Sequence, residues 1–377
     1  MRILSLLLLL SFPLLSQDII LQKEPVNSKF LECIYHIYNS DTTSFQQSSV
    51  ELKKLIPAHP ANDLIIGLSL YWSKYPLNLD GGELIRLKET LVATTERCNE
   101  ILENYEDDFE IRYIDMIAHS ILAVTYSRDS QFFKAAGEAK KAYNYFRDGF
   151  ELMKDYNEFH FSSGLYSYYR EKYPEAYPIY QAIVWMFKSG DKEEGLRLMA
   201  LAFEETVYAK AEAAHYLSHV LMRYEMKPDK SLRYIEYLSN HYPGNLFFRA
   251  NYIENLLFLN RYDDAALLLD DFPDNNHAFY QMSKRVFTGI VAESKYEYEF
   301  AERSFKDALE ISKRGTSEEI NHLKSLTYCG LARLSLLVGD RERTVSFYEM
   351  AYDLVKYDLY RREPKEYLSE HDPNFKN

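Results

Sequence analysis

Glycine and proline are scarce in this chain of 377 residues, with 13 and 12 copies. A β-sandwich or a phosphate-loop enzyme needs more glycine at its turns, so both classes are disfavoured. Cysteine is also rare. Only Cys33, Cys98 and Cys329 are present, and an odd number without a C-x-x-C pair indicates neither a disulfide framework nor a zinc ribbon. We expect each cysteine to be a small buried apolar residue.

Positive charge is not in excess either. The chain has 44 Lys and Arg against 57 Asp and Glu, a net charge of −13, which disfavours a protein that binds nucleic acid. The motifs GxGxxG, GxxxxGK[ST], GxSxG and HExxH are all missing. We therefore expect no catalysis and no cofactor.

Long apolar runs are confined to the beginning of the chain. Arg2 is followed by an apolar run over 4–15, which is too short to span a bilayer comfortably and is typical of a signal peptide. Cleavage after Ser16 would leave a chain that begins at Gln17 without an integral membrane span. This pattern predicts export to the periplasm or cell envelope of a bacterium, and the alternative is an uncleaved anchor.

The chain is rich in aromatic residues and in helical periodicity. It contains 33 tyrosines and 22 phenylalanines, and apolar residues recur at helical spacing between short turns. One stretch, 282–315, carries small and aromatic residues at fixed positions of a 34-residue pattern: Gly289 at position 8, Tyr298 at 17, Ala301 at 20, Phe305 at 24 and Ala308 at 27. Related patterns recur over 116–150, 212–245, 246–276 and 325–358.

Three further helix pairs are predicted in the first part of the chain. They are 28–38 with 45–55, 62–73 with 84–104, and 158–170 with 191–205, where 171–189 is an insertion. The predicted organisation is a signal peptide over 1–16, irregular hairpins over 17–205, regular repeats over 206–358 and a polar tail over 359–377.

These stretches resemble tetratricopeptide repeats, in particular those of exported bacterial proteins whose repeat array is interrupted. The resemblance implies an all-α, right-handed superhelical solenoid of antiparallel helical hairpins. It also implies a scaffold that binds a protein or peptide partner in its concave groove, without catalysis. A glycan- or small-ligand-binding envelope protein is the alternative, and a metal-dependent hydrolase is less favoured.

In such repeats the first helix of each pair lines the concave face. We select as partner-binding candidates the residues Tyr168, Tyr169, Arg170, Tyr216, Arg223, Phe247 and Glu254. The same register places further residues on this face: Phe161, Leu165, Ala213, Val220, Ala250, Leu257, Ser283, Val286, Ile290, Glu293, Leu326, Cys329, Arg333 and Leu336. Tyrosine offers a large flat area at low entropic cost, which suits a peptide or a sugar.

One motif has metal-ligand spacing. Glu212, His215 and His219 fall on one helical face, but a di-metal site would need a second such helix, and the sequence shows none. We expect no metal. His219 occupies repeat position 8 and is predicted to pack against Ser231 at position 20.

The insertion contains an apolar run over 182–187 that includes Trp185 and Phe187. Because such a run is an aggregation hazard in water, we expect it to be buried. Our hypothesis packs it on the concave face beside Leu165 and the tyrosines Tyr168, Tyr169 and Tyr216, with Arg170 and Arg223 as polar ligand contacts. The alternative is an extension of the second helix of the pair.

Overall fold

The computed structural model describes residues 19–73, 75–76, 81–176, 181, 185, 187–314, 318–373 and 375. The predicted signal peptide over 1–16 lies outside these residues, as does part of the insertion. Across the described residues the secondary structure is helical, with no β-strand. The predicted all-α fold is confirmed.

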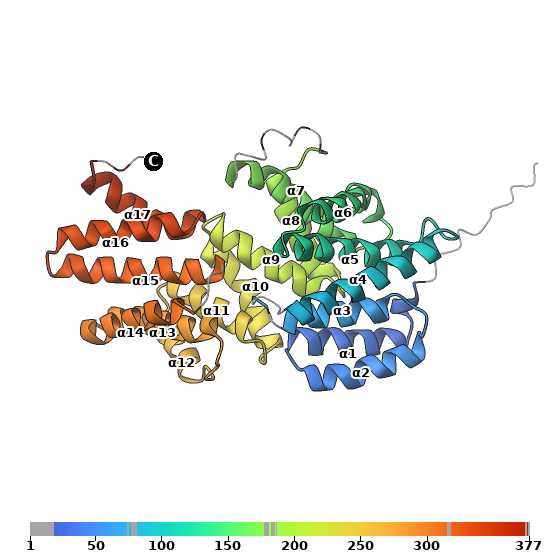
Figure 1. The fold of residues 1–377 in the computed structure, drawn as a ribbon, viewed down its shortest axis with the longest axis horizontal. Coiled ribbons are helices and arrows are strands. Elements are labelled where there is room, and N and C mark those ends of the chain that lie inside the picture. Colours follow the sequence, from blue (N-terminus) through green and yellow to red (C-terminus); the bar gives the residue numbers. More distant parts are fainter. Residues whose placement is uncertain are drawn as a thin grey trace, which may run out of the picture.

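A short 3-10 helix, η1 (Ile20–Gln22), precedes the α-helices (Figure 1). The helices of the first half are α1 (Val26–Tyr38), α2 (Thr42–Leu55), α3 (Ala61–Ser73), α4 (Gly81–Leu102), α5 (Phe109–Arg128), α6 (Phe132–Leu152), α7 (Phe159–Ala176) and α8 (Lys192–Glu205). Those of the second half are α9 (Lys210–Arg223), α10 (Pro228–His241), α11 (Leu246–Phe258), α12 (Tyr262–Asp270), α13 (Ala278–Ser294), α14 (Tyr298–Ser312), α15 (Glu318–Leu337), α16 (Arg341–Leu354) and α17 (Asp358–His371).

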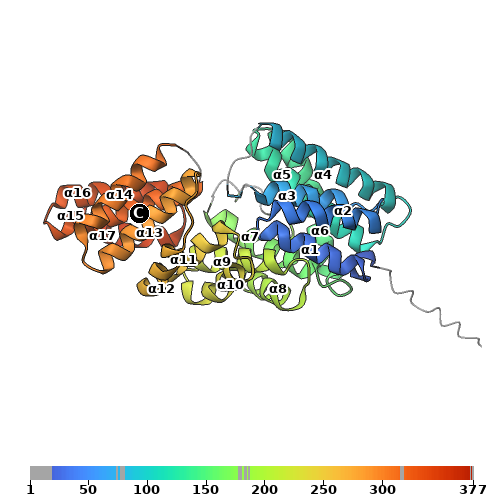
Figure 2. The ribbon, with the colours of Figure 1, turned by 90° about the horizontal axis from the view of Figure 1, so that it is seen from below.

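Consecutive helices pack as antiparallel pairs, from α1 with α2 to α15 with α16, and α17 packs against the last pair. Each predicted pair is present, so the tetratricopeptide-like array of hairpins is confirmed. In Figures 1 and 2 the pairs from α1 to α8 gather on one side, α11 to α17 form the other, and α9 and α10 lie between them. We call α1–α10 the N-terminal ring and α11–α17 the C-terminal arm.

Small residues at the predicted positions let the two helices of a pair approach each other. A Cβ added to Gly164 would lie 2.7 Å from the Met199 backbone nitrogen, and one added to Gly195 would lie 2.5 Å from that of Tyr168. In the arm, the ring of Phe305 fills the space that a Cβ on Gly289 would occupy. The small residues of the repeat pattern thus allow the two helices of a pair to cross at a short distance.

The turn inside most pairs uses one left-handed residue, placed two positions before the second helix. These residues are Ser40, Ser130, Met226, Asn260, Tyr296 and Gly339, with φ between 51° and 75°. In the turn at Tyr296 the amide of Glu297 donates to the carbonyl of Ala292 at 2.9 Å, which is the bond that ends a helix in a Schellman motif. The same turn therefore repeats in the ring and in the arm.

The N-terminal ring is closed by contacts between distant segments. The Asn245 side-chain amide donates to the carbonyl of Tyr38 at 2.7 Å, and the Gly244 amide donates to Asn39 Oδ1 at 2.8 Å. A Cβ on Gly244 would lie 2.4 Å from the Asn39 carbonyl oxygen, so glycine is required at this approach. The turn between α1 and α2 is thereby joined to the turn between α10 and α11.

Most of the segment predicted as a polar tail forms a helix that packs against the end of the array. Residues 358–371 form α17, in which Leu359, Tyr360 and Leu368 are buried. The segment follows the last repeat as one more first helix, and its apolar stripe covers the end of the array. The predicted boundary at residue 205 stays a prediction.

Candidate functional site

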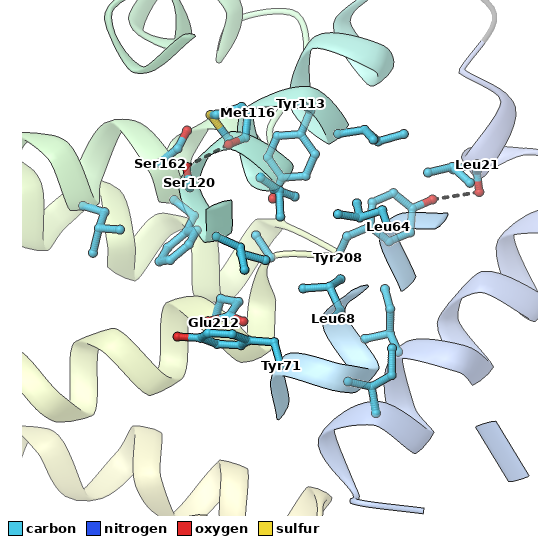
Figure 3. Close-up of a pocket in the computed structure, with 18 of the residues that line it drawn as sticks. Leu21, Leu64, Leu68, Tyr71, Tyr113, Met116, Ser120, Ser162, Tyr208 and Glu212 are labelled. Atoms are coloured by element: carbon cyan, nitrogen blue, oxygen red, sulfur yellow. Dashed lines mark hydrogen bonds between the residues drawn. The ribbon is translucent and has the colours of Figure 1, made fainter. Parts of the chain in front are cut away.

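The concave face of the N-terminal ring encloses an apolar cavity of about 180 Å³, which we call the inner cavity (Figure 3). It is lined mainly by the first helices of the pairs, α1, α3, α5, α7 and α9. Phe161, Leu165 and Tyr216 contribute to its wall, as the concave register predicts.

Three hydroxyls of the wall are bonded within the protein, whereas the buried hydroxyl of Tyr156 has no hydrogen-bond partner among the described residues. The Ser120 hydroxyl donates to the Met116 carbonyl at 2.7 Å, and that of Tyr208 donates to the Leu21 carbonyl at 2.8 Å (Figure 3). The Ser162 hydroxyl donates to the carbonyl of Phe159. The donors of these three hydroxyls are therefore satisfied within the protein, and most of the remaining wall is apolar.

Two buried carboxylates position the chain around the inner cavity. Glu110 accepts from the amides of Ile20 and Leu21, and so holds η1 against α5. Glu158 accepts from the amides of residues 207–209 and caps the beginning of α9; burial raises its pKa, although these three bonds act against the rise. Both carboxylates serve the architecture.

Glu212 lines the inner cavity, as Glu110 does. Its Oε1 accepts from the Tyr38 hydroxyl at 2.8 Å and from Trp72 Nε1 at 3.1 Å (Figure 3 shows its position). Burial raises the pKa of Glu212, and the bonds from Tyr38 and Trp72 only partly oppose this. The site therefore disfavours the charged form of Glu212 more than water does.

A wider hollow of about 500 Å³ adjoins the inner cavity; we call it the entry groove. The two spaces share five lining residues: Ser120, Val124, Phe146, Leu165 and Tyr216. Three of the predicted site residues, Tyr169, Arg170 and Tyr216, line the entry groove. The structure thus brings these three residues together, and their role as partner contacts stays a prediction.

The expected burial of Trp185 is wrong, because its side chain is 77% exposed. Phe187 lies at the entry groove instead, with its ring centroid 5.0 Å from that of Tyr143. Residues 171–176 extend α7, the first helix of the pair, rather than the second. The remainder of the apolar run, apart from Trp185 and Phe187, lies outside the described residues.

The C-terminal arm has an open hollow of about 380 Å³, which we call the C-terminal groove. Its apolar floor includes Leu257, Ile290 and Leu326, and its charged residues include Glu293 and Arg333, all five on the predicted concave face. Glu363 of α17 completes the wall. The sequence analysis does not predict this residue, because it treats the segment as a polar tail. The helical spacing of the buried residues 360, 364 and 368 is the sequence signal that indicates a helix here.

Three charges form a chain along this groove. Arg333 donates to both oxygens of Glu293, at 2.6 and 2.7 Å, and to both oxygens of Glu363, at 2.9 Å. The Tyr348 hydroxyl also donates to Glu363 at 2.8 Å. Two carboxylates against one guanidinium leave the groove with a net negative charge.

Arg223 and Glu254 do not line an open groove, contrary to the prediction. Both are buried, with Glu254 Oε2 3.5 Å from Arg223 and Oε1 3.3 Å from His322, and the Tyr360 hydroxyl donates to Oε1 at 2.9 Å. Burial acts to raise the pKa of Glu254, but His322, Arg223 and Tyr360 outweigh it and lower the value. The beginning of α17 covers these residues, which the sequence pattern did not reveal.

Tyr168 and Phe247 are also wrong as partner contacts. Tyr168 is fully buried beside Gly195, and its hydroxyl donates to Glu225 at 2.8 Å. Phe247 is buried against the ring of Tyr75, with centroids 4.7 Å apart. Tyr168 lies within its own hairpin and Phe247 lies where ring and arm meet, so neither is presented to a partner.

The three possible metal ligands of α9 do not converge. Glu212 lines the inner cavity, whereas His215 and His219 line a separate small cavity of about 40 Å³. Burial lowers the pKa of both histidines, to about 3 for His215, so both are neutral. Across the described residues, no group of three His, Cys, Asp or Glu side chains is placed to hold a metal ion.

Ser231 contacts Ser218, and not His219 as predicted. The Ser231 hydroxyl donates to the carbonyl of Ser218 at 2.9 Å and accepts from the Asn255 side chain. His219 packs instead between the rings of Tyr224 and Tyr357. The small residue of this helix crossing is thus Ser218.

None of the helices in the described part of the chain has the length and apolar character needed to cross a membrane. No protein-family profile matches the chain, and no curated protein matches it. Among solved structures it is similar to yeast Tom70, with 12% identity, 92% of this chain and 80% of that chain covered, and a TM-score of 0.38. It is also similar to a tetratricopeptide repeat protein from Parabacteroides merdae, with 16% identity, 80% and 99% covered, and a TM-score of 0.30.

Proposed function

We propose that this protein is a non-enzymatic scaffold that binds a segment of a partner protein in the C-terminal groove. The observation that carries the proposal is the combination of an apolar floor at Leu257, Ile290 and Leu326 with the charged chain of Glu293, Arg333 and Glu363. An open groove of this kind buries apolar side chains and orients them through polar contacts at the rim.

The charges indicate the chemistry of the partner. Arg333 is engaged on both sides by carboxylates, so the groove offers negative rather than positive charge to a ligand. The whole chain is also acidic, with a net charge of −13. A segment in which leucine or phenylalanine stands next to lysine or arginine is therefore the expected ligand.

The scaffold is further proposed to act outside the cytoplasm, in the periplasm or at the envelope of a bacterium. This part rests on the basic and apolar residues of 1–16. N-terminal sequencing of the native protein tests it. A chain that begins near Gln17 supports export, and an intact Met1 contradicts cleavage.

Peptide binding can be tested with a defined peptide set rather than with an extract. Fluorescence polarisation would compare labelled ten-residue peptides that carry Leu-Lys or Phe-Arg steps with peptides in which the basic residues are replaced by glutamate. We expect the basic peptides to bind more tightly by about tenfold at low salt, and the difference to shrink as salt rises.

Two substitutions locate the binding. Ile290→Asp places a charge on the apolar floor and should abolish binding, while Glu363→Gln should weaken it several-fold. Glu366→Gln, on an exposed part of the same helix α17, is the matched control and should have no effect. Equal binding of basic and acidic peptides, or binding that survives Ile290→Asp, would remove the proposal.

A further inference from the structure

We propose that the inner cavity and the entry groove together form a binding site for a single-chain anionic amphiphile, a long-chain fatty acid. The site lies in the N-terminal ring and is independent of the peptide groove in the arm. Three observations carry the proposal: two adjoining and mainly apolar spaces, wall hydroxyls of Ser120, Ser162 and Tyr208 that are bonded within the protein, and the position of one cation.

The path runs from the surface into the centre of the ring. At the outer end Tyr173 and Phe187 are 44% and 38% exposed, and Val124, which lines both spaces, is 43% exposed. At the junction Leu165 and Tyr216 line both spaces, and beyond them the inner cavity is enclosed by α1, α3, α5, α7 and α9. The two spaces therefore adjoin at side chains that are mostly apolar, and the proposed ligand places its alkyl chain across this junction.

The wall suits an alkyl chain better than a peptide or a sugar. A peptide backbone or a sugar brings donors and acceptors that need partners when they leave water. The hydroxyls of Ser120, Ser162 and Tyr208 are already committed to backbone carbonyls. A chain of methylene groups needs no such partners and gains from burial.

The cavity volume agrees with this occupant. An apolar cavity of about 150 Å³ stays dry and holds a molecule the size of benzene. The inner cavity, at about 180 Å³, can hold the terminal part of an alkyl chain, and the larger entry groove can hold the remainder.

Charge places the polar end of the ligand at the entrance. Among the described residues that line the entry groove, Arg170 is the one charged side chain. Its Nη1 lies 3.6 Å from Glu171 Oε1, a carboxylate that is partly open to solvent. In the proposed complex the ligand carboxylate lies at Arg170, and the methyl end of its alkyl chain points toward Glu212. The raised pKa of Glu212 reflects surroundings with little water, which is consistent with an apolar neighbour.

Isothermal titration of the delipidated full chain with palmitate tests the proposal. Palmitate should bind in a one-to-one ratio, and affinity should rise from octanoate to palmitate as more of the path is filled. Absence of binding by all chain lengths would overturn the proposal. An affinity independent of chain length would do so as well, because the apolar path would then be unused.

Three variants distinguish this site from non-specific binding. Leu165→Trp narrows the junction and should weaken palmitate binding at least tenfold. Arg170→Gln should weaken palmitate binding about tenfold while leaving hexadecanol binding unchanged. Leu326→Trp, in the C-terminal groove, is the matched control and should not alter palmitate binding.

Circular dichroism of each variant verifies that the helices are intact. If Leu165→Trp unfolds the chain, Val124→Trp offers a second obstruction at a more exposed position of the same path. Palmitate binding that is equal in wild type and in a folded obstructed variant would show that the ligand lies elsewhere, and the proposal would fail.

Discussion

The N-terminal ring and the C-terminal arm are built from the same helix pairs, yet they present opposite kinds of hollow. In the ring, contacts of Asn245 with Tyr38 and of Gly244 with Asn39 close the concave face into an apolar interior. In the arm the concave face stays open, and Glu293, Arg333 and Glu363 stand along it. Closure of the array, more than the repeat motif, thus decides whether the concave residues face a cavity or solvent.

The ring and the arm also differ in how they surround a buried carboxylate on the first helix of a pair. Glu212 of α9 accepts from two neutral donors, Tyr38 and Trp72, and its pKa is raised. Glu254 of α11 is buried with Arg223 and His322, and its pKa is lowered. Removal of the two charges should therefore affect stability in opposite directions.

The largest effect is expected for Glu254→Gln. The substitution leaves Arg223 buried without its carboxylate and weakens the bond from Tyr360, so the free energy of unfolding should fall by about 3 kcal/mol. Urea unfolding at pH 7 measures this. A loss below 1 kcal/mol would show that α17 does not depend on this network.

Gly244→Ala tests the closure of the ring. The added methyl group meets the Asn39 carbonyl oxygen, so the free energy of unfolding should fall by about 2 kcal/mol. Thermal unfolding is the measurement. Gly137→Ala in α6, where an added Cβ meets nothing within 4 Å, is the control and should be neutral or stabilising. Equal behaviour of the two variants would mean that the ring is not tightly closed.

Glu212→Gln should stabilise the protein at pH 7 by about 1 kcal/mol, because it replaces a carboxyl whose charged form the site disfavours and keeps an acceptor for Tyr38 and Trp72. The pKa of Glu212 is raised above its ordinary value of 4.5, so the folded state holds its proton more tightly than the unfolded state. This contribution to stability is fully present below about pH 4.5 and is lost as the pH rises through the folded-state pKa.

The gain from Glu212→Gln should consequently vanish at pH 4 and grow toward pH 7, which urea unfolding at the two pH values measures. Glu299→Gln, at an exposed position of α14, is the matched control and should show no such change. Destabilisation by Glu212→Gln at pH 7 would contradict the contrast between the two carboxylates.

The smallest effect concerns a feature that the two regions share. Tyr296 has a φ of 64°, so Tyr296→Gly should relieve backbone strain and raise the free energy of unfolding by about 0.5 kcal/mol. Ser40→Gly, at the equivalent turn of the ring, should behave alike. Chemical denaturation of the two variants compares them, and opposite signs would show that the turns are not equivalent.

The helix pairs could be predicted because their determinants are local in the sequence. Small residues such as Gly164 and Gly289 and aromatic residues such as Phe305 recur at fixed spacing, and the structure places them at helix crossings. The left-handed turns were less visible, since Ser, Met, Asn and Tyr occupy positions where glycine is the usual signal.

The site could be predicted only in part. Tyr169, Arg170 and Tyr216 lie together because their helices are neighbours in the array. Arg223 and Glu254 became buried because residues 357–360, more than 100 positions later, fold over them. Such coverage depends on small rotations summed over several pairs, and no short residue pattern encodes that sum. The exposure of Trp185 likewise could not be inferred from apolar composition alone.

Closure of the ring also bears on how the chain folds. In an open solenoid each repeat touches only its neighbours, so folding can begin anywhere and spread along the array. Here the hydrogen bond that closes the ring joins the Tyr38 carbonyl to Asn245, which is 207 positions later in the sequence. Contacts of such long sequence separation carry a large loop-closure entropy and slow the rate-limiting step. The ring is therefore expected to fold as one late cooperative unit, while the arm, whose pairs contact mainly their neighbours, can form stepwise.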